Sequence, residues 1–414
     1  MLKPLILSSR DVVGGAALAA YRLHQALQGI GVDSKMLVQV KHSDDDTVFG
    51  AQPSTFTKLV PKLNKLPLML YPHRKAVSFS AQWFPERTVS KAAGFAPDVI
   101  NLHWINDGFL RIESLAQLKM TIVWTMHDMW PFTGGCHYDE GCGRYEASCG
   151  TCPLLKSGTE NDLSRWIWNR KYRSWQNLNI TFIALSNWLA DCARNSSLLH
   201  NFTIEVIPNC IDTNIYKPLD RRDARDLLDL PQDKNLVGFG ALHATSIRRK
   251  GFHLLKPALR QLRDSSPGND LELAVFGSSK DNNQEDLALR THYLGIIDDE
   301  RKLAAFYSAV DVFVVPSTED NLPNTVMEAL ACGTPCVAFN IGGLPDLIDH
   351  QQNGYLCRPF EEQELAKGIT WVLEDEERRQ RLSKNARLKV LENYAPKIVA
   401  NQYLSLYEKL ARPV

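Results

Sequence analysis

The feature that most constrains the fold is the alternation of short apolar segments with helical patterns along the 414 residues. Parallel strands need crossover connections, usually helices, so this alternation is typical of a parallel sheet with helices on both faces. A first series of apolar segments lies at Leu5–Leu7, Met36–Val40, Val99–Leu102, Ile122–Met126 and Phe182–Leu185. A second series lies at Leu236–Gly240, Leu271–Phe276, Asp311–Val315 and Pro335–Phe339. The sequence therefore predicts an α/β protein with two doubly wound, Rossmann-like units.

The chain length also predicts two domains, because 414 residues exceed the size of one ordinary hydrophobic core. A strand ends and prolines follow between Ile207 and Pro218, which indicates the connection between the two series. We expect an N-terminal domain at residues 1–207, a C-terminal domain at 208–392 and a closing helical segment at 393–414.

Composition and charge exclude several classes of protein. Hydrophobic residues make up 44% and charged residues 23%, as in globular proteins, and the formal net charge is zero. A neutral chain is a poor match for nucleic acid, whose binding depends on positive charge. No run of about 18 apolar residues occurs, and the first residues, MLKPLILSSRD, become polar too early for a signal peptide. We therefore expect a cytoplasmic protein without a nucleic acid partner.

The segment from Val314 to Asn340 carries the clearest chemical signal. A buried strand ends at Pro316, and Asp320 and Glu328 stand eight residues apart around the turn Asn321, Leu322, Pro323 and Asn324. We expect Asn324 to cap the helix that follows. Backbone amides and two carboxylates would then face a crevice at the carboxyl end of the strand, where amides suit phosphate or sugar oxygens and carboxylates suit hydroxyls. The alternative is an acidic loop that caps an ordinary helix.

A glycine pair follows the first strand of the chain. Gly14 and Gly15 open a helical pattern, and glycines there allow an anion to approach the backbone closely. A plain tight turn is the alternative interpretation. The G-x-G-x-x-G fingerprint is absent from the sequence, which disfavours a nicotinamide-dependent enzyme.

In order and content these motifs resemble the retaining glycosyltransferases of family 4, which have the GT-B fold of two Rossmann-like domains facing a central cleft. The resemblance implies that Glu328 holds the ribose hydroxyls of a nucleotide donor. It implies that Asp320, or its neighbour Glu319, holds the donor sugar together with the amides of the turn that follows. Gly14 and Gly15 would face the donor diphosphate. The resemblance also implies that the closing segment crosses back to the first domain.

Two further elements of the family pattern concern the leaving group and the sugar. The run Arg248-Arg249-Lys250-Gly251 resembles a family segment in which an arginine and a lysine neutralise the diphosphate. The resemblance implies these roles for Lys250 and for Arg249 or its neighbour Arg248; a solvated cluster of surface cations is the alternative. His127, just past a strand, matches a family histidine that contacts the donor sugar, and a histidine satisfied by the adjacent Asp128 is the alternative. Asp320 and Ala241 depart from the family, which usually has glutamate and arginine there.

The resemblance implies a glycosyltransferase that moves a sugar from a nucleotide-sugar donor to a glycan or lipid-linked glycan acceptor. It implies retention of configuration, by front-face attack, in the synthesis of exopolysaccharide or cell-surface polysaccharide. No cofactor is implied for catalysis, because basic side chains stabilise the diphosphate. Two alternatives stay open: a sugar-nucleotide epimerase of the same fold, and a catalytically silent protein that binds nucleotide or glycan.

Four cysteines lie close together in an insertion at residues 135–153. They are Cys136, Cys142, Cys149 and Cys152, spaced C-x5-C-x6-C-x2-C. In a chain without a secretion signal this cluster favours a structural zinc site over disulfides. Free thiols, an iron–sulfur cluster and disulfides are the alternatives.

The stretch from Phe56 to Arg74 mixes basic and apolar residues. Lys58, Lys62, Lys65 and Arg74 alternate there with leucines. Such a surface suits anionic lipid, so one hypothesis is peripheral contact with the inner surface of the cytoplasmic membrane. The other is an irregular loop packed on the first domain.

Overall fold

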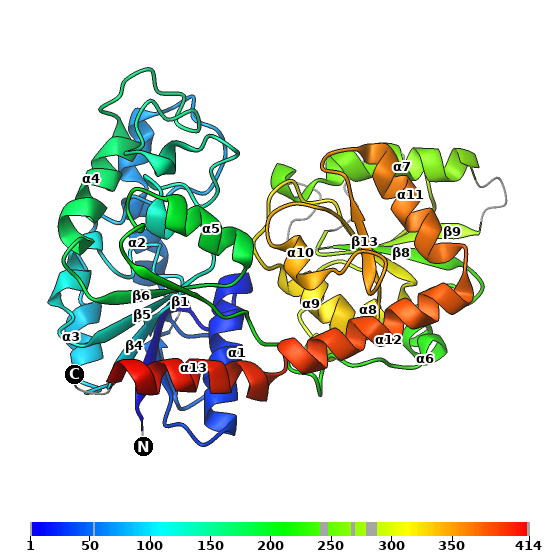
Figure 1. The fold of residues 1–414 in the computed structure, drawn as a ribbon, viewed down its shortest axis with the longest axis horizontal. Helices are drawn as coiled ribbons and strands as arrows, with labels where there is room; N and C mark the ends of the chain where they lie inside the picture. The colour runs from blue at the N-terminus through cyan, green and yellow to red at the C-terminus, as the bar shows by residue number, and fades with distance from the viewer. Residues whose placement is uncertain (1, 53, 241–246, 266–269, 279–287, 412–414) are drawn as a thin grey trace. The chain divides into compact units, whose positions relative to one another are not determined.

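The structure, a computed structural model, describes residues 2–52, 54–240, 247–265, 270–278 and 288–411. These form two compact units, one made by the chain up to Cys210 and from Val399 onward, the other by Ile211–Ile398 (Figure 1). The chain passes into the second unit after residue 210, where the sequence predicted 207, and returns at residue 399, where it predicted 393.

Within the described residues, the first unit contains a seven-stranded parallel sheet in the order β3-β2-β1-β4-β5-β6-β7. Its strands are β1 (Pro4–Arg10), β2 (Lys35–Val40), β3 (Val48–Ala51), β4 (Val99–Leu102), β5 (Thr121–Met126), β6 (Ile180–Ala184) and β7 (Thr203–Val206). Its helices are α1 (Gly15–Gly29), α2 (Thr55–Asn64), α3 (Thr88–Ala93), α4 (Leu163–Trp175), α5 (Asn187–Asn195) and α13 (Pro396–Ala411), with 3-10 turns η1 (Leu66–Leu70), η2 (Ile112–Gln117), η3 (Trp130–Phe132) and η4 (Arg144–Glu146).

The first sheet is buried on both faces because successive side chains of a strand point to opposite sides. Leu5 and Leu7 of β1 join the core beneath α4 and α5, whereas Ile6 joins the core beneath α1 and α13. Helix α13 lies beside α1 in Figure 1. Its Tyr407 accepts a 2.7 Å hydrogen bond from the buried Asn101 of β4. The last helix is therefore an integral part of the first unit.

The second unit holds a sheet of six parallel strands in its described part, in the order β10-β9-β8-β11-β12-β13. The strands are β8 (Asn235–Gly240), β9 (Leu271–Phe276), β10 (Thr291–Tyr293), β11 (Val312–Val315), β12 (Cys336–Phe339) and β13 (Gly354–Cys357). The helices are α6 (Arg221–Leu227), α7 (Phe252–Ser265), α8 (Glu300–Ala309), α9 (Asn324–Ala331), α10 (Leu344–Leu347), α11 (Glu362–Leu373) and α12 (Glu376–Asn393), with the 3-10 turn η5 (Arg248–Lys250).

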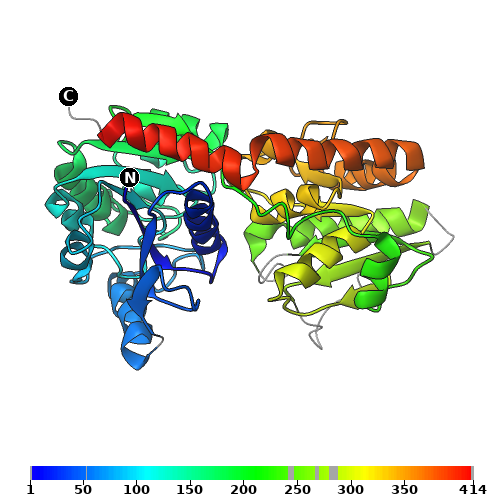
Figure 2. The same cartoon turned by 90° about the horizontal axis from the view of Figure 1, so that it is seen from below.

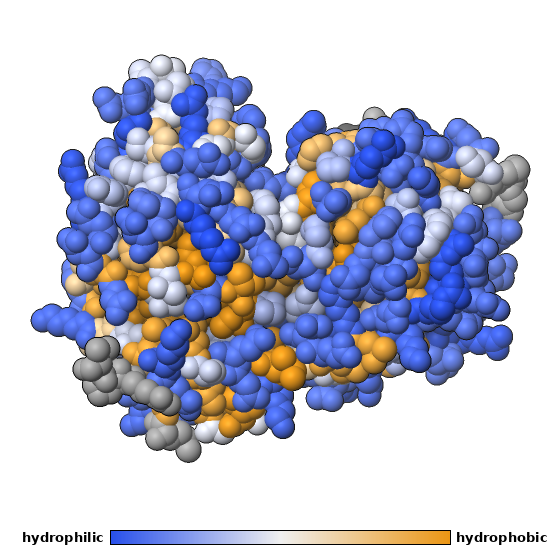
Figure 3. Space-filling model, in the orientation of Figure 1, coloured by the Kyte–Doolittle hydropathy of each residue, from blue (hydrophilic) through white to orange (hydrophobic). Residues whose placement is uncertain are grey.

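Two apolar layers enclose the second sheet. Helices α7 and α11 pack on one face through a cluster that includes Val237 and Val314. On the other, Phe276 and Phe313 of the strands pack against Phe306 and Tyr307 of α8, with ring centroids 4.9–6.4 Å apart. Hydrophilic residues cover most of this unit on the face seen in Figure 3.

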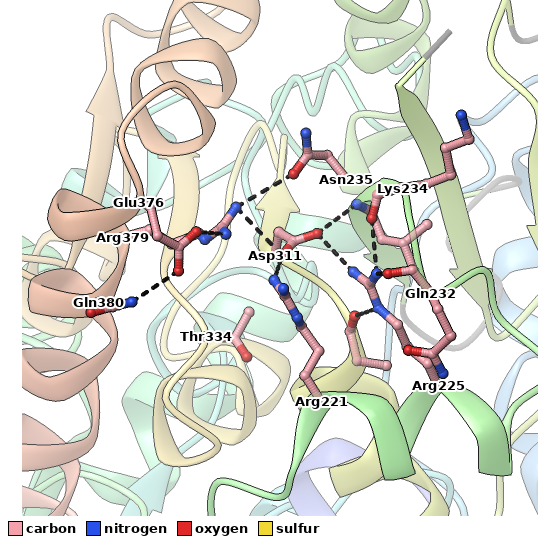
Figure 4. Close-up of polar contacts among 12 residues, drawn as sticks. Arg221, Arg225, Gln232, Lys234, Asn235, Asp311, Thr334, Glu376, Arg379 and Gln380 are labelled. Atoms are coloured by element: carbon pink, nitrogen blue, oxygen red, sulfur yellow. Dashed lines mark hydrogen bonds and ion pairs between the residues drawn. The ribbon is translucent and has the colours of Figure 1, made fainter.

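A buried carboxylate ties together the amino edge of the second sheet. Asp311, directly before β11, accepts hydrogen bonds from Arg221 (2.6 Å) and Arg225 (2.8 Å) and lies 3.5 Å from Arg379 (Figure 4). The backbone N–H of Leu236 in β8 also donates to it, at 2.7 Å. The remaining donors of Arg225 bind backbone carbonyls, including that of Ala309 at 2.9 Å. This network joins β8, β11, α6, α8 and α12 at the edge opposite the predicted site.

Candidate functional site

The carboxyl edge of the second sheet gathers the loops that follow β8, β11 and β12. The residue after η5, Gly251, has a positive φ of 73°, and a Cβ on it would lie 1.7 Å from the carbonyl oxygen of Pro316. Only glycine permits that approach. The backbone N–H of Thr318 also donates to the carbonyl of Arg249 at 2.8 Å. These contacts place the basic turn against the acidic loop that follows β11.

The predicted residues Asp320, Arg249 and Lys250 meet there in one ion cluster. Lys250 Nζ lies 2.7 Å and Arg249 Nη1 3.3 Å from the Asp320 carboxylate, and Ser317 Oγ donates to it at 3.1 Å. Burial alone would raise the pKa of Asp320, but Lys250 and Arg249 outweigh burial and lower the pKa from 3.8 to about 2. Asp320 is therefore an anion near neutral pH, held by cations whose side chains are 18–27% exposed.

Asp320 and Glu319, the two candidates for the first acid, differ in how far their side chains are buried. Asp320 is 5% exposed, whereas Glu319 is only partly buried and its backbone carbonyl accepts a 2.5 Å hydrogen bond from Arg249. The geometry favours Asp320 as the acid that faces the cations.

A second glycine pair, which the sequence reasoning missed, fixes the backbone of Asp320. Gly343 donates its N–H to the Asp320 carbonyl at 3.0 Å, and a Cβ on Gly342 would lie 2.1 Å from that oxygen. Both glycines follow β12, as Gly14 and Gly15 follow β1. A glycine pair after an apolar strand was therefore the available signal.

Glu328 lies on α9 and is 3% exposed. Tyr307 of α8, which the sequence did not single out, donates a 3.0 Å hydrogen bond from its hydroxyl to Glu328 Oε2. Burial and the neighbouring Glu328 charge raise the pKa of Tyr307 well above 10.0, so this tyrosine stays protonated and donates. The two predicted acids thus have different partners: cations for Asp320 and a tyrosine hydroxyl for Glu328.

The turn before α9 differs from the prediction in one respect. Asn324 was expected to cap the helix, but it is the first helical residue; Pro323 holds the cap position and no side chain caps the helix. Asn321 and Leu322 are buried, 2% and 6% exposed, between the two acids. The prediction was wrong because the chain enters the helix one residue earlier than asparagine's capping preference suggested.

In the first unit, Gly14 caps α1 with a φ of 98°, a conformation that favours glycine, and Gly15 begins the helix. The loop before them is held by Asp11, which the sequence reasoning also missed. This buried carboxylate accepts the backbone N–H groups of Val12 (2.9 Å), His42 (3.0 Å) and Ser43 (2.8 Å). Burial would raise its pKa, but these hydrogen bonds lower it below 3.8. Asp11 therefore fixes the approach to the glycine turn. Ala241 lies outside the described residues.

His127 follows β5 and pairs with a second imidazole. Its Nε2 lies 2.8 Å from Nδ1 of His103, which follows β4. Burial lowers the pKa of His127 from 6.5 to about 4, against the opposing effect of Asp128, and burial together with His127 lowers the pKa of His103 well below 6.5. Both rings are therefore neutral near pH 7.

Asp128, the alternative partner expected for His127, has further partners of its own. Asp128 Oδ2 accepts from His137 Nδ1 at 2.6 Å and from Trp104 Nε1 at 3.1 Å. His137 in turn pairs with Ser80 through Nε2, at 2.9 Å. Because His137 belongs to the cysteine-rich insertion, this chain of contacts links the insertion to the loop that carries His127.

The four cysteines of the insertion are free thiols, Cys136 and Cys152 buried and Cys142 and Cys149 partly exposed. Burial raises the pKa of all four thiols. Across the described ranges, no three His, Cys, Asp or Glu side chains are arranged to hold a metal ion. The zinc site at Cys136, Cys142, Cys149 and Cys152 therefore stays a prediction, and no step of the chemistry depends on it.

Comparison with known proteins identifies both units. The family model "Glycosyltransferase Family 4" matches residues 13–215, and "Glycosyl transferases group 1" matches residues 221–389. WcaC of Escherichia coli K12, named for a glycosyl transferase role in colanic acid biosynthesis, is 25% identical over 346 residues, covering 78% of this chain and 80% of WcaC. The D-inositol 3-phosphate glycosyltransferase of Paenarthrobacter aurescens is 32% identical over 194 residues, 44% of this chain and 46% of that enzyme.

Solved structures share the whole fold. Sucrose-phosphate synthase of Thermosynechococcus elongatus matches with a TM-score of 0.69 at 20% identity, over 99% of both chains. HepE of Anabaena, solved with UDP and glucose, matches with a TM-score of 0.65 at 20% identity, over 99% of this chain and 100% of HepE. The predicted GT-B architecture of two Rossmann-like units is confirmed.

Proposed function

Because this chain belongs to the family 4, group 1 glycosyltransferases, we propose that it transfers a sugar from a nucleotide-sugar donor to a glycan acceptor with retention of configuration. The observation that carries the proposal is the cluster of Lys250, Arg249 and Asp320 at the carboxyl edge of the second sheet. Ligands of open α/β sheets bind at that edge. HepE, which shares the fold, was solved with UDP and glucose.

Lys250 and Arg249 are proposed to stabilise the diphosphate as it leaves. An ammonium has three donors and a guanidinium five, so each can bind Asp320 and a phosphate oxygen together. Charge that grows on the leaving oxygen is then met by cations already in place, which lowers the barrier without reorganisation. Asp320, kept ionised by the same cations, would accept hydrogen bonds from hydroxyls of the donor sugar, and the turn Asn321–Asn324 would contact the same sugar.

Glu328 is proposed to hold the ribose hydroxyls of the donor. The hydrogen bond from Tyr307 orients the carboxylate through Oε2. A carboxylate has acceptor sites for about four hydrogen bonds, so it can bind Tyr307 and two vicinal hydroxyls together. His127, a neutral hydrogen-bonding group, and the turn Gly14–Gly15 are proposed for the family roles of contacting the sugar and the diphosphate.

For the reaction, we propose front-face substitution. The bond between the anomeric carbon and the diphosphate oxygen breaks, and a short-lived oxocarbenium-like species forms. The acceptor hydroxyl attacks the same face, and its proton passes to the departing phosphate oxygen. No protein nucleophile is then required, and the protein contributes position and electrostatic stabilisation.

For the acceptor, we propose a lipid-linked glycan used in exopolysaccharide or cell-surface polysaccharide synthesis. WcaC is named for colanic acid biosynthesis. Helix α2 and turn η1 expose apolar residues, with Met69 and Leu70 72% and 80% exposed, beside the exposed Lys58, Lys62 and Lys65. Apolar side chains flanked by cations suit an anionic membrane surface. None of the helices within the described residues is long and apolar enough to cross a membrane.

The test begins with calorimetry of UDP-, GDP-, ADP- and dTDP-sugars. One donor should bind wild-type protein, and Glu328→Gln should weaken it by about 10- to 100-fold, as expected when a buried hydrogen bond to a charged group is lost. Glu374→Gln, an exposed change on the same unit, should bind like wild type. Equal donor affinity in Glu328→Gln and in the control Glu374→Gln would show that Glu328 does not bind the donor.

Turnover separates the three candidate functions. A transferase should release the nucleoside diphosphate only when an acceptor glycan is supplied, with the sugar recovered on the acceptor in its original anomeric configuration. An epimerase would convert the donor without acceptor. A silent protein would bind donor and leave it intact with every acceptor.

A further inference from the structure

The first unit contains an apolar cavity of about 580 Å³ beneath α2, which is drawn blue and projects from the body of that unit in Figure 2. Its lining includes the buried side chains of Leu37, Val38, Val60 and Phe109, which are 3–8% exposed. The volume lies in the range of small-molecule sites, about 300–1,000 Å³. An apolar space of this size suits a hydrocarbon and disfavours a sugar, whose hydroxyls would lose their hydrogen bonds.

The exposed part of the lining carries opposite chemistry. Arg87 and Lys91 line the cavity and are exposed, whereas Glu86, the one acid among the described residues of the lining, is partly buried and accepts the backbone N–H of Thr88. The cavity therefore combines an apolar interior with two cations in contact with solvent. A ligand that matches both is an amphiphile with a hydrocarbon chain and an anionic headgroup.

Hydrogen bonds hold the walls of the cavity in place. Gln82 donates to the carbonyls of Ile105 (2.8 Å) and Leu110 (2.7 Å) and accepts the N–H of Gly108 at 3.0 Å. It is also bonded to Asn64, the last residue of α2. A Cβ on Gly108 would lie 2.7 Å from Val60, so glycine is needed where α2 crosses this loop. The cavity is thus built into the fold.

We propose that this cavity binds the hydrocarbon chain of the lipid phosphate that carries the acceptor glycan, with Arg87 and Lys91 binding its phosphate. Helix α2, which contributes Thr57 and Val60 to the cavity, is followed by the turn η1, which exposes Met69 and Leu70 as an apolar surface for a bilayer. The inference rests on the proposed function, because it names the lipid part of the proposed acceptor. It assigns α2 a role in lipid recognition as well as in contact with the surface.

The first experiment uses wild-type protein and octyl, decyl and dodecyl phosphate below their micellar concentrations, with binding measured by calorimetry. Each added methylene should tighten binding about fourfold, since it moves from water into an apolar space. Dodecanol should bind more weakly than dodecyl phosphate, because Arg87 and Lys91 recognise the charge. Affinity that does not change with chain length would overturn the proposal.

Two sets of variants locate the site. In Val60→Trp the larger side chain should occupy the cavity and lower the affinity for dodecyl phosphate at least tenfold. Val60→Phe, a smaller change, replaces it if the tryptophan variant does not fold. The double variant Arg87→Glu, Lys91→Glu should lower the affinity for dodecyl phosphate more than the affinity for dodecanol. Lys119→Glu, an exposed residue of the same unit outside the cavity, is the matched charge control and should bind as wild type. Equal binding by all variants would place the lipid elsewhere and sink the proposal.

Donor binding separates this inference from the proposed function. Val60→Trp should bind the nucleotide sugar as wild type does, because Val60 is not among the residues proposed to hold the donor. If donor binding depends on Glu328 but no alkyl phosphate binds, the proposed transferase function is supported and the proposed lipid site is wrong. Binding to phosphatidylglycerol vesicles without any chain-length dependence would reduce the role of α2 to surface contact and overturn the cavity assignment.

Discussion

The two ends of strand β11 carry two buried aspartates with similar partners and different surroundings. Asp311, before the strand, is surrounded by Arg221, Arg225 and Arg379, and Asp320, after it, by Lys250 and Arg249. Arg225 is 1% exposed and its other donors bind backbone carbonyls, whereas Lys250 and Arg249 are 18% and 27% exposed.

This difference separates a structural ion cluster from a candidate catalytic one. At the Asp311 cluster the most buried cation, Arg225, is bonded to the protein's own backbone, and Arg379 also pairs with Glu376, so the cluster joins elements at the amino edge of the sheet. Around Asp320 the cations reach solvent at the carboxyl edge, where ligands of α/β sheets bind. A buried acid with cations is therefore a functional candidate when the cluster also lies at the edge of the sheet where ligands bind.

The largest expected effect is on the structural cluster. Asp311→Asn should lower the free energy of unfolding by about 3–5 kcal/mol, because it leaves Arg225 buried without its counter-charge. Denaturant unfolding measures this, with Asp233→Asn, whose side chain is 80% exposed, as a control expected to change stability by less than about 0.5 kcal/mol. A loss below about 1 kcal/mol in the free energy of unfolding of Asp311→Asn would contradict a structural role for the Asp311 cluster.

The next effect concerns His127, buried beside a second neutral imidazole instead of within a charge cluster. Its pKa is lowered from 6.5 to about 4, so between these values the unfolded chain binds a proton that the folded chain does not. Stability should therefore fall as pH drops from 6.5 to 4, by up to about 3 kcal/mol. Denaturant unfolding at stepped pH should show a smaller fall for His127→Gln, and an equal fall in both proteins would contradict the assignment.

Asp320→Asn should affect function more than stability. We expect the donor affinity to fall about 10- to 100-fold and the free energy of unfolding by only about 1–2 kcal/mol, since the partner cations are partly exposed. The folded pKa of about 2 lies below 3.8, so the Asp320 contribution is present above pH 3.8 and lost as pH falls towards 2. Calorimetry with the donor and acid unfolding should be carried out on wild type and on Asp320→Asn. Unchanged donor binding by the variant would contradict a functional role for the Asp320 cluster.

The smallest expected effect lies within the Asp311 cluster. The Arg221 side chain is 49% exposed, so Arg221→Ala should lower the free energy of unfolding by about 0.5–1 kcal/mol. Arg225→Met removes a buried charge and should cost several times more, because Asp311 and the backbone carbonyls lose their main donor. Thermal or denaturant unfolding of the two variants side by side would show whether exposure sets the energy of each arginine.

The central strands were predictable, and the strands that were missed lie at sheet edges. The buried segments that became β1, β2, β5, β8, β9 and β11 have nearly continuous apolar runs. The structure adds β3, β10 and β13, each at an edge of its sheet. An edge strand has a neighbour on one side only and tolerates polar residues, so its sequence lacks the apolar run.

The candidate site divides in the same way. Asp320, Lys250 and Gly14 could be singled out as candidates because they lie in the loops after apolar strands, and Glu328 because it lies on the helix that follows the acidic turn. Tyr307, Gly342 and Asp11 could not, because their roles depend on partners far away in sequence: Glu328, the Asp320 backbone and the N–H groups of His42 and Ser43.

The sequence by itself determined the alternating strands and helices, the two units, and which loops carry charged residues, because local periodicity and turn residues encode these features. Only the tertiary structure decided that Arg249 and Lys250 pair with Asp320, that Tyr307 orients Glu328, that His127 pairs with His103, and that an apolar cavity lies beneath α2. These features depend on long-range packing of side chains, whose distances no local pattern contains.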